Sequence, residues 1–201
     1  MLSQIKITTH VDSGKLAKFK SINTSVEEND FCSKMRRKKN SICMKCYAVN
    51  MEKRYPSFRT NIQSNSEILS SRILDTHELP RINDLAFRFH STGELINDIH
   101  FLNFINIAVD NSRTYFTLWT KRVDIIKRVL KTHTLPDNLK LIYSNPKVDS
   151  KDIKPPKHFV KVFTGYSKDT KIKNINCKGK CVDCMLCYSD NNVKNIREII
   201  K

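Results

Sequence analysis

The segment from residue 85 to residue 144 alternates between two hydrophobic patterns, and this alternation limits the folds open to the chain. Three stretches are rich in aromatic and β-branched residues, as strands are, and the two stretches between them have apolar residues at helical spacing. The expected strands cover 85–91, 114–120 and 139–144, and the expected helices cover 98–109 and 123–131. Strand–helix–strand units of this length favour a parallel sheet with helical crossovers.

Further elements extend the pattern on both sides. They are a strand within 18–26, a helix at 56–74, a strand at 158–165 and a short closing helix at 191–201. Three prolines between residues 144 and 158 favour a loop there. The sequence therefore predicts an α/β fold, a small parallel sheet of βαβ units similar to part of a TIM barrel, with cysteine-rich loops at both ends. We expect a core domain of residues 1–165 and a cysteine-bearing appendage of residues 166–201.

Seven cysteines fall into two groups that flank the predicted sheet. The N-terminal cysteine group has the spacing C-x10-C-x2-C and consists of Cys32, Cys43 and Cys46. The C-terminal cysteine group has the spacing C-x3-C-x2-C-x2-C and consists of Cys177, Cys181, Cys184 and Cys187. The first residues lack the apolar stretch of a signal peptide, so we expect a reducing cytoplasm. In that compartment clustered cysteines more often bind metal or carry redox chemistry than form disulfides.

The division of the cysteines into three and four favours iron–sulfur chemistry over zinc. Iron–sulfur clusters take three or four thiolates at such spacings, so this division uses all seven cysteines. Zinc requires four ligands, and a site built from residues 43, 46, 184 and 187 would leave three cysteines unused. We expect one or two [4Fe–4S] clusters, with zinc as the alternative. A cluster at the N-terminal cysteine group would keep one iron open to a small molecule.

The formal net charge of +16 is concentrated beside the cysteines. One basic run covers residues 34–39, and a second covers residues 168–180. Charge gathered in this way favours a polyanion such as nucleic acid or a phosphate-bearing substrate, whereas evenly spread lysines would indicate only solvation. No apolar run approaches the ~18 residues of a membrane-spanning helix, so no membrane partner is expected.

Two predicted strands end in polar residues that are suited to ligand binding. The segment STGEL (91–95) follows one strand, and Lys121 follows the next. Ligands of α/β folds bind at the carboxyl ends of strands. Gly93 permits close backbone approach, Ser91 and Glu94 can accept from an ammonium group, and Lys121 can bind a carboxylate or phosphate. The alternative is a turn glycine, a helix-capping acid and a solvated lysine.

The order of several short motifs resembles the phage protein family called gene product 88. These motifs are CYA (46–48), YPSFRTN (55–61), RFHSTGE (88–94), YFTLWTKR (115–122) and the C-terminal cysteine group. The resemblance covers most of the chain, from about residue 18 to residue 187. The resemblance implies a phage or prophage origin and does not define a reaction.

A more distant resemblance is to radical S-adenosylmethionine enzymes. Three cysteines after a first strand, a Gly93-Glu94 step after the next strand and a terminal four-cysteine cluster are similar to features of those enzymes. The resemblance implies that the N-terminal cysteine group holds a cluster whose open iron binds S-adenosylmethionine. It also implies that Ser91, Gly93 and Glu94 hold this ligand, and that the basic loops hold a phosphate-bearing or nucleic-acid substrate.

The chain departs from the enzyme pattern in three ways, the first of which is that only four or five strands are readable where six are expected. The usual C-x3-C-x2-C spacing is stretched to C-x10-C-x2-C, and the usual paired glycines appear as Thr92-Gly93. The alternative function is therefore a non-catalytic module that binds nucleic acid or a protein partner. In that module the cysteine sites, with zinc or iron–sulfur, would only hold loops in place.

Overall fold

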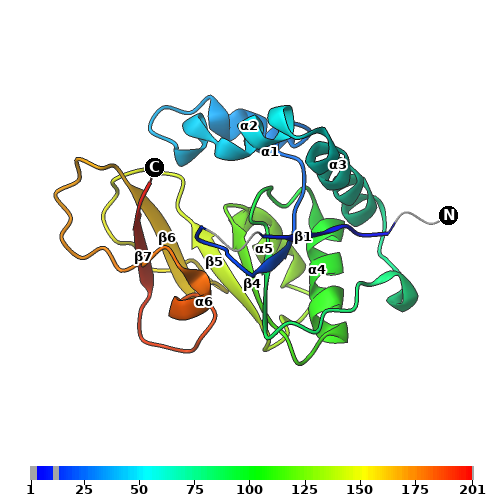
Figure 1. Cartoon of the computed structure of the whole chain (residues 1–201). Coiled ribbons are helices and arrows are strands. Elements are labelled where there is room, and N and C mark those ends of the chain that lie inside the picture. Colours follow the sequence, from blue (N-terminus) through cyan, green and yellow to red (C-terminus); the bar gives the residue numbers. More distant parts are fainter. Residues whose placement is uncertain (1–3, 11–13, 201) are drawn as a thin grey trace.

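One seven-stranded sheet organises the chain in the computed structural model, which describes residues 4–10 and 14–200 (Figure 1). The strands are β1 (Ile7–Thr9), β2 (Lys20–Ile22), β3 (Ala86–Phe89), β4 (Tyr115–Thr120), β5 (Leu139–Ser144), β6 (Lys161–Tyr166) and β7 (Asn195–Ile199). Their order in the sheet is their order in the sequence. β1 is antiparallel to β2, and the other neighbouring pairs are parallel. The predicted α/β fold with a parallel sheet is confirmed, and the sequential order is that of a barrel wall rather than of a doubly wound sheet.

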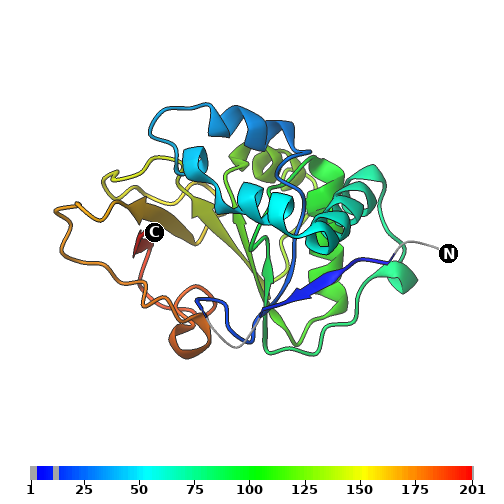
Figure 2. The same ribbon diagram turned by 45° about the horizontal axis from the view of Figure 1, so that its top comes forward.

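The helices are α1 (Asp30–Arg36), α2 (Tyr47–Arg54), α3 (Pro56–Ser71), α4 (Asp98–Asp110), α5 (Val123–Val129) and α6 (Cys181–Cys184), with 3-10 turns η1 (Ile42–Lys45) and η2 (Thr76–Glu78). α1, α2 and α3 lie in the connection from β2 to β3, α4 lies in that from β3 to β4, and α5 lies in that from β4 to β5; α1 and α2 are seen at the top of the molecule in Figures 1 and 2. Within the described part of the chain, no helix combines the length and the apolar character needed to cross a bilayer.

Side chains alternate between the two faces of the sheet, as strand geometry requires. Phe89 faces the helices, where its ring stacks on Phe104 of α4 at 4.1 Å and on Phe116 of β4 at 4.9 Å between centroids. The opposite face carries a smaller apolar cluster, which consists of Trp119, Ile142, Phe163 and Ile196. Partly buried residues of the C-terminal cysteine group pack against this second cluster. One face of the sheet is therefore covered by helices and the other by a cysteine-bearing segment.

Most of the predicted elements are present within a few residues. The strands expected at 18–26, 85–91, 114–120, 139–144 and 158–165 contain or overlap β2 to β6, and the helices expected at 56–74, 98–109 and 123–131 correspond to α3, α4 and α5. The crossover from β5 to β6 contains no helix, as its prolines predicted. The strand β1 was not expected. It pairs antiparallel with β2 through three residues.

The helix expected at 191–201 is wrong, because residues 195–199 form β7. Ile196 is 1% exposed and packs on the second face of the sheet, and the backbone pairs with β6 from Val162 to Tyr166. Pairing along this strand outweighs the helical spacing of Val193 and Ile196, and isoleucine is itself well suited to strands. The predicted boundary at residue 165 falls within β6, and the segment after that boundary returns to the same sheet as β7.

The cysteine-rich loop expected before residue 55 is also largely helical. Asn29 caps α1 with its side-chain oxygen, which accepts hydrogen bonds from the backbone N–H of Phe31 (3.0 Å) and of Cys32 (3.3 Å). Ser41 caps η1 in the same way through Cys43 N–H at 3.1 Å. Side-chain caps satisfy the free amides at a helix start and are worth about 1 kcal/mol each. Two short polar residues thus fold the segment that carries the N-terminal cysteine group.

Acid should destabilise this fold through a buried histidine in α4. The ring of His100 is fully buried, its Nδ1 accepts from Ile96 N–H at 3.3 Å, and burial lowers its pKa to about 3. Unfolded His100 binds a proton below about pH 6.5 and folded His100 does not until about pH 3, so the unfolded state holds more protons between these values. We expect the free energy of unfolding to fall as the pH drops through this window, by at most about 1.4 kcal/mol per pH unit from this residue.

Urea unfolding at pH 7 and at pH 5 measures this effect. His100→Gln should flatten the dependence without removing it, because neighbouring His90 is buried too and its pKa is also lowered by burial. His133→Gln, which changes an exposed histidine, is the matched control and should leave the dependence as in the parent chain. An equal loss of stability from pH 7 to pH 5 in the parent chain and in His100→Gln would contradict the assignment.

Candidate metal centres

The N-terminal cysteine group is assembled from three successive elements above the sheet. Cys32 lies in the first turn of α1, Cys43 lies in η1, and Cys46 is the residue from which α2 starts. The side-chain amide of Asn29, which caps α1, donates to the backbone oxygen of Glu94 at 3.0 Å. This bond fixes the start of α1 against the segment that follows β3. All seven cysteines of the chain are free thiols and partly buried.

Glu94 lies at the carboxyl end of β3 and is held by the end of β4. Its Oε1 accepts from the Leu95 N–H at 2.9 Å and from the Thr120 hydroxyl, and its Oε2 accepts from the Lys121 N–H at 2.8 Å. The residue is 3% exposed. The ammonium group of Lys121 donates to the hydroxyl of Ser144, at the end of β5, at 3.1 Å. Three adjacent strand ends therefore form one polar floor.

The three thiols share this polar floor with Glu94 and Lys121. Burial raises the pKa of Cys32, the carboxylate of Glu94 raises it further, and Lys121 opposes both. Burial also raises the pKa of Cys46. For Lys121 burial lowers the pKa, but Cys43, Glu94, Cys32 and Cys46 together outweigh burial and raise it. Five of the residues singled out from the sequence are thus brought within electrostatic reach of one another.

Ser91 and Gly93 line the turn that leads from β3 to Glu94. The Ser91 hydroxyl donates to Asn23 Oδ1 at 2.8 Å, and the same oxygen accepts from the backbone N–H of Ser91 (2.9 Å) and of Thr92 (3.0 Å). Gly93 has a φ of +109° and lies against the backbone of Thr24. Their cofactor-binding roles remain predictions. Asn23, which the sequence analysis did not single out, holds the turn in place.

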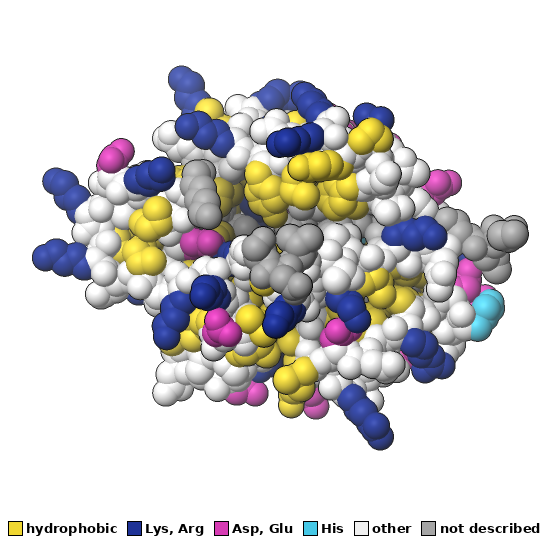
Figure 3. All heavy atoms as spheres, viewed as in Figure 1, with side chains coloured by type: hydrophobic (Ala, Val, Ile, Leu, Met, Phe, Trp, Pro, Cys, Tyr) yellow, Lys and Arg dark blue, Asp and Glu magenta, His cyan; other side chains and the backbone are white. Residues whose placement is uncertain are grey.

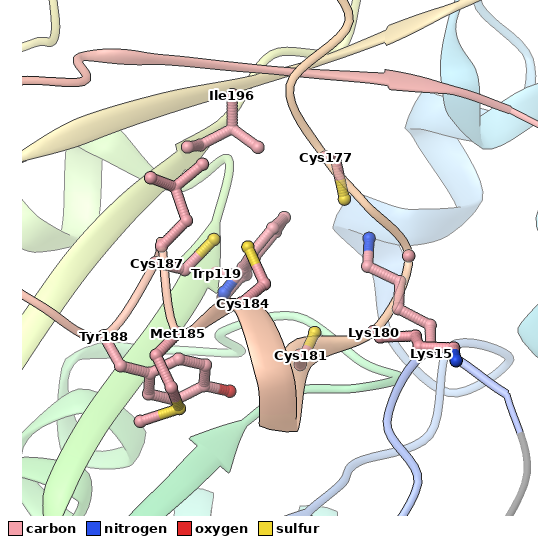
Figure 4. Close-up of a pocket in the computed structure, with 12 residues that line it drawn as sticks. Lys15, Trp119, Cys177, Lys180, Cys181, Cys184, Met185, Cys187, Tyr188 and Ile196 are labelled. Atoms are coloured by element: carbon pink, nitrogen blue, oxygen red, sulfur yellow. The ribbon is translucent and has the colours of Figure 1, made fainter.

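The C-terminal cysteine group encloses a small hollow over the second face of the sheet. Figure 4 shows its four side chains around this hollow, with Trp119 behind them and Lys15 at the side. α6 carries Cys181 and Cys184, and Met185 ends that helix in a left-handed conformation with a φ of +46°. The backbone N–H of Cys181 donates to the Lys15 oxygen at 2.9 Å, which ties the group to the N-terminal segment.

Two cations and one indole lie beside this hollow, and the sequence analysis had assigned none of them to a site. The Arg88 guanidinium is 4.2 Å and the Lys15 ammonium is 5.5 Å from the centroid of the Trp119 ring. Burial raises the pKa of Cys187 to about 12, and both cations oppose this rise. The Trp119 Nε1–H is buried and has no hydrogen-bond partner among the described residues.

The spacing of the cysteine sulfur atoms bears on which kind of metal centre each group could hold. Among the described residues, which include all seven cysteines, no three sulfur atoms lie within 4.8 Å of one another. Four thiolates around one zinc ion at about 2.3 Å would be about 3.8 Å apart. A cluster places several irons and sulfides between its thiolates, which therefore lie farther apart. Zinc and an iron–sulfur cluster therefore differ in the spacing of the thiolates that each requires.

Among the described residues, one set of metal-ligand side chains lies within 4.8 Å of one another, namely Asp75, His77 and Glu78 at the start of η2 and within it. This set is largely exposed. The Glu78 carboxylate already accepts two hydrogen bonds from the guanidinium of Arg72, one of them at 2.7 Å. It also accepts a hydrogen bond from the Asp75 N–H, which caps η2. These contacts account for the carboxylate, so the cysteine groups remain the candidate metal centres.

Comparison with known proteins places the chain in a family. No curated protein and no solved structure matches the chain. The family model described as Gene product 88 matches residues 2–174. The matched region contains the N-terminal cysteine group, Glu94 and Lys121, and it ends before the C-terminal cysteine group. Because the match covers most of the chain and agrees with the order of motifs, the chain belongs to the gene product 88 family of phage proteins.

Proposed function

We propose that this phage protein binds an iron–sulfur cluster at each cysteine group, and that the N-terminal cluster serves a radical reaction of the S-adenosylmethionine type. The observation that carries the proposal is the convergence of three thiols, without a fourth, on the polar floor of Glu94 and Lys121. Three thiolates would hold three irons of a [4Fe–4S] cluster and leave one for a small ligand. When bound, the cluster and S-adenosylmethionine supply the one-electron chemistry, and the protein supplies position and charge.

Glu94 is suited to hold the ammonium group of an amino-acid ligand. A carboxylate has about four acceptor positions. The bonds from Leu95, Thr120 and Lys121 occupy three of them and fix the side chain, which leaves an acceptor position on Oε2. An ammonium donor at that oxygen would form a charge-assisted hydrogen bond in a buried setting, where such bonds are strong.

Lys121 is suited to the carboxylate of the same ligand. An ammonium group has three donors, and the bond to Ser144 uses one of them. The Lys121 backbone N–H donates to Glu94 Oε2, and the charge of Glu94 raises the pKa of Lys121, so the carboxylate and the ammonium group lie within electrostatic reach of each other. This pairing complements the ammonium and carboxylate of an α-amino acid, which S-adenosylmethionine carries at one end.

The alternative is a non-catalytic module in which metal only holds the C-terminal cysteine group on the sheet. The packing of Cys177 and Cys187 against the second apolar cluster favours a structural role for that group in either case. The seven free thiols suit the reducing cytoplasm of a host cell, which is where we infer that the protein acts. Positive charge near the thiols suits an anionic substrate, such as a phosphate-bearing small molecule or nucleic acid.

Spectroscopy on anaerobically purified protein tests the proposal. The reconstituted protein should hold iron and sulfide, and S-adenosylmethionine should alter the electron paramagnetic resonance signal of the reduced N-terminal cluster. Glu94→Gln should retain iron but require about tenfold more S-adenosylmethionine for the same change, because a charge-assisted hydrogen bond is weakened. Glu67→Gln, at an exposed position on α3, is the matched control. Protein that binds zinc alone, or a signal that never responds to S-adenosylmethionine, would favour the non-catalytic module.

A further inference from the structure

Half of the net charge of the chain lies in one short segment that contains two cysteines of the N-terminal cysteine group. Residues 34–59 contain nine lysines and arginines and one acid, Glu52, which gives +8 of the total +16. Glu52 is 1% exposed, and its carboxylate accepts from the Ser25 hydroxyl at 2.8 Å and the Val26 N–H at 2.7 Å. The single acid therefore does not neutralise the surface of this segment.

The cations of this segment are also largely free of partners. Within the described residues, Arg36 alone among the nine forms an ion pair, which it makes with Glu27. The other eight have exposed side chains and no acidic neighbour in ion-pair range. They are Lys34, Arg37, Lys38, Lys39, Lys45, Lys53, Arg54 and Arg59. Unpaired cations at this density raise the local potential and attract a polyanion.

Large apolar side chains stand exposed among these cations. Tyr47 is 58%, Met44 is 53% and Tyr55 is 48% exposed. The Tyr47 hydroxyl donates to the backbone oxygen of Ser91 at 2.5 Å, so this ring is held at its tip while much of its surface faces solvent. Figure 3 shows hydrophobic side chains exposed near α1 and α2, with lysine and arginine side chains around them. A ring held in this way loses little freedom when another ring stacks on it.

Helical spacing places aromatic and basic groups along one side of α2. Ala48 and Glu52, four residues apart, are buried, whereas Tyr47, Asn50 and Arg54 follow the three- and four-residue spacing of the opposite side and are exposed. The helix of eight residues is about 12 Å long. Tyr55 follows directly, with the Arg54 guanidinium 5.5 Å from the centroid of its ring. Two tyrosines thus mark the ends of a short basic path.

We propose that this aromatic–basic surface, formed by Met44, Lys45, Tyr47, Lys53, Arg54 and Tyr55, binds single-stranded nucleic acid. Phosphates would lie against the cations and unpaired bases would stack on the two tyrosines, a combination that sequence-tolerant single-strand binding uses. A duplex hides the faces of its bases and would gain only the electrostatic part. Cys43 and Cys46 lie in the same elements, so a bound strand would pass beside the candidate metal centre. The inference that nucleic acid is the substrate rests on the proposed function. The inference that the surface binds a single strand does not depend on it.

Fluorescence anisotropy with a labelled 12-nucleotide single strand and with the matching duplex tests the inference. The whole protein, with its metal content measured, should bind the single strand more tightly than the duplex. Tyr55→Leu should weaken single-strand binding by about tenfold, because stacking on one base is worth about 1–3 kcal/mol. Tyr115→Leu is the matched control, because Tyr115 is 49% exposed and lies at the start of β4, away from the proposed surface. The affinity of this variant for the single strand should be unchanged. Equal affinity for both probes, or equal effects of the two variants, would overturn the inference.

Charge neutralisation supplies an independent measurement. Changing Lys45, Lys53 and Arg54, the cations of this surface, to glutamine should reduce the affinity and make it less dependent on salt, because fewer counterions are released on binding. An unchanged salt dependence would contradict the role of this segment. The response of the cluster to S-adenosylmethionine, measured on the same sample, separates the two proposals. Binding without that response would leave the inference standing and the radical function rejected, and a response without binding would do the reverse.

Discussion

Replacing Gly93 by alanine is expected to destabilise the fold by about 3 kcal/mol or more, a large part of the stability of a typical domain. The φ of +109° at this residue is costly for any side chain that carries a Cβ. An added Cβ would also lie 2.8 Å from the backbone oxygen and 2.9 Å from the backbone nitrogen of Thr24. Backbone atoms cannot move aside as a flexible side chain can. Denaturant unfolding followed by circular dichroism measures the loss.

Gly14→Ala separates conformational strain from this clash. Gly14 has a φ of +90°, and a Cβ built on it would meet nothing within 4 Å. We expect a loss of only about 1–2 kcal/mol, the cost of the backbone conformation alone. A similar loss in both variants would mean that the contact between Gly93 and Thr24 is not the reason for the glycine.

Single cysteine substitutions are expected to remove one metal centre and spare the other. Cys184→Ser should lower the iron content of the reconstituted protein by about half, since each group would hold its own [4Fe–4S] cluster. It should also speed hydrogen exchange in residues 166–190, because this segment has only a four-residue helix of its own. Cys46→Ser should cause a similar loss of iron and abolish the response to S-adenosylmethionine, with residues 166–190 still protected. Iron analysis and hydrogen exchange measure the two effects.

Met185→Leu is the control for the C-terminal variant, because it changes a neighbouring side chain without removing a thiol. It should keep its full iron content. Full iron in Cys184→Ser, or loss of all iron from either cysteine variant, would show that the seven thiols are not divided into three and four.

The elements that the sequence predicted well are those whose signals are local. α4 begins at Asp98, where the side chain of Asn97 accepts from the His100 N–H at 2.9 Å, and its apolar face continues for three turns. β5 has the predicted bounds because a compact apolar run lies between polar residues. The grouping of Cys43 and Cys46 with Glu94 and Lys121 followed from a general rule, that the ends of parallel strands meet at one edge of a sheet.

Features that depend on a partner far away in the chain could not be predicted from the sequence. Arg88 and Trp119 look like ordinary strand residues, and their stacking over the C-terminal cysteine group appears only when β3 and β4 lie side by side. The ten residues between Cys32 and Cys43 read as a basic loop, because the bond from Asn29 to Glu94, which fixes the start of α1, joins positions far apart in the chain. β7 was mistaken for a helix because its pairing partner, β6, lies about thirty residues earlier.

The position of β7 at the end of the sheet has a consequence for the proposed metal binding. Among the described strands β7 pairs only with β6, and the long connection between them contains the C-terminal cysteine group. Closing a long connection costs chain entropy, which a cofactor bound to four of its residues would offset. Without that cofactor we expect β7 to detach first and to leave β6 as an open edge, whose unpaired amides and carbonyls can pair with another chain.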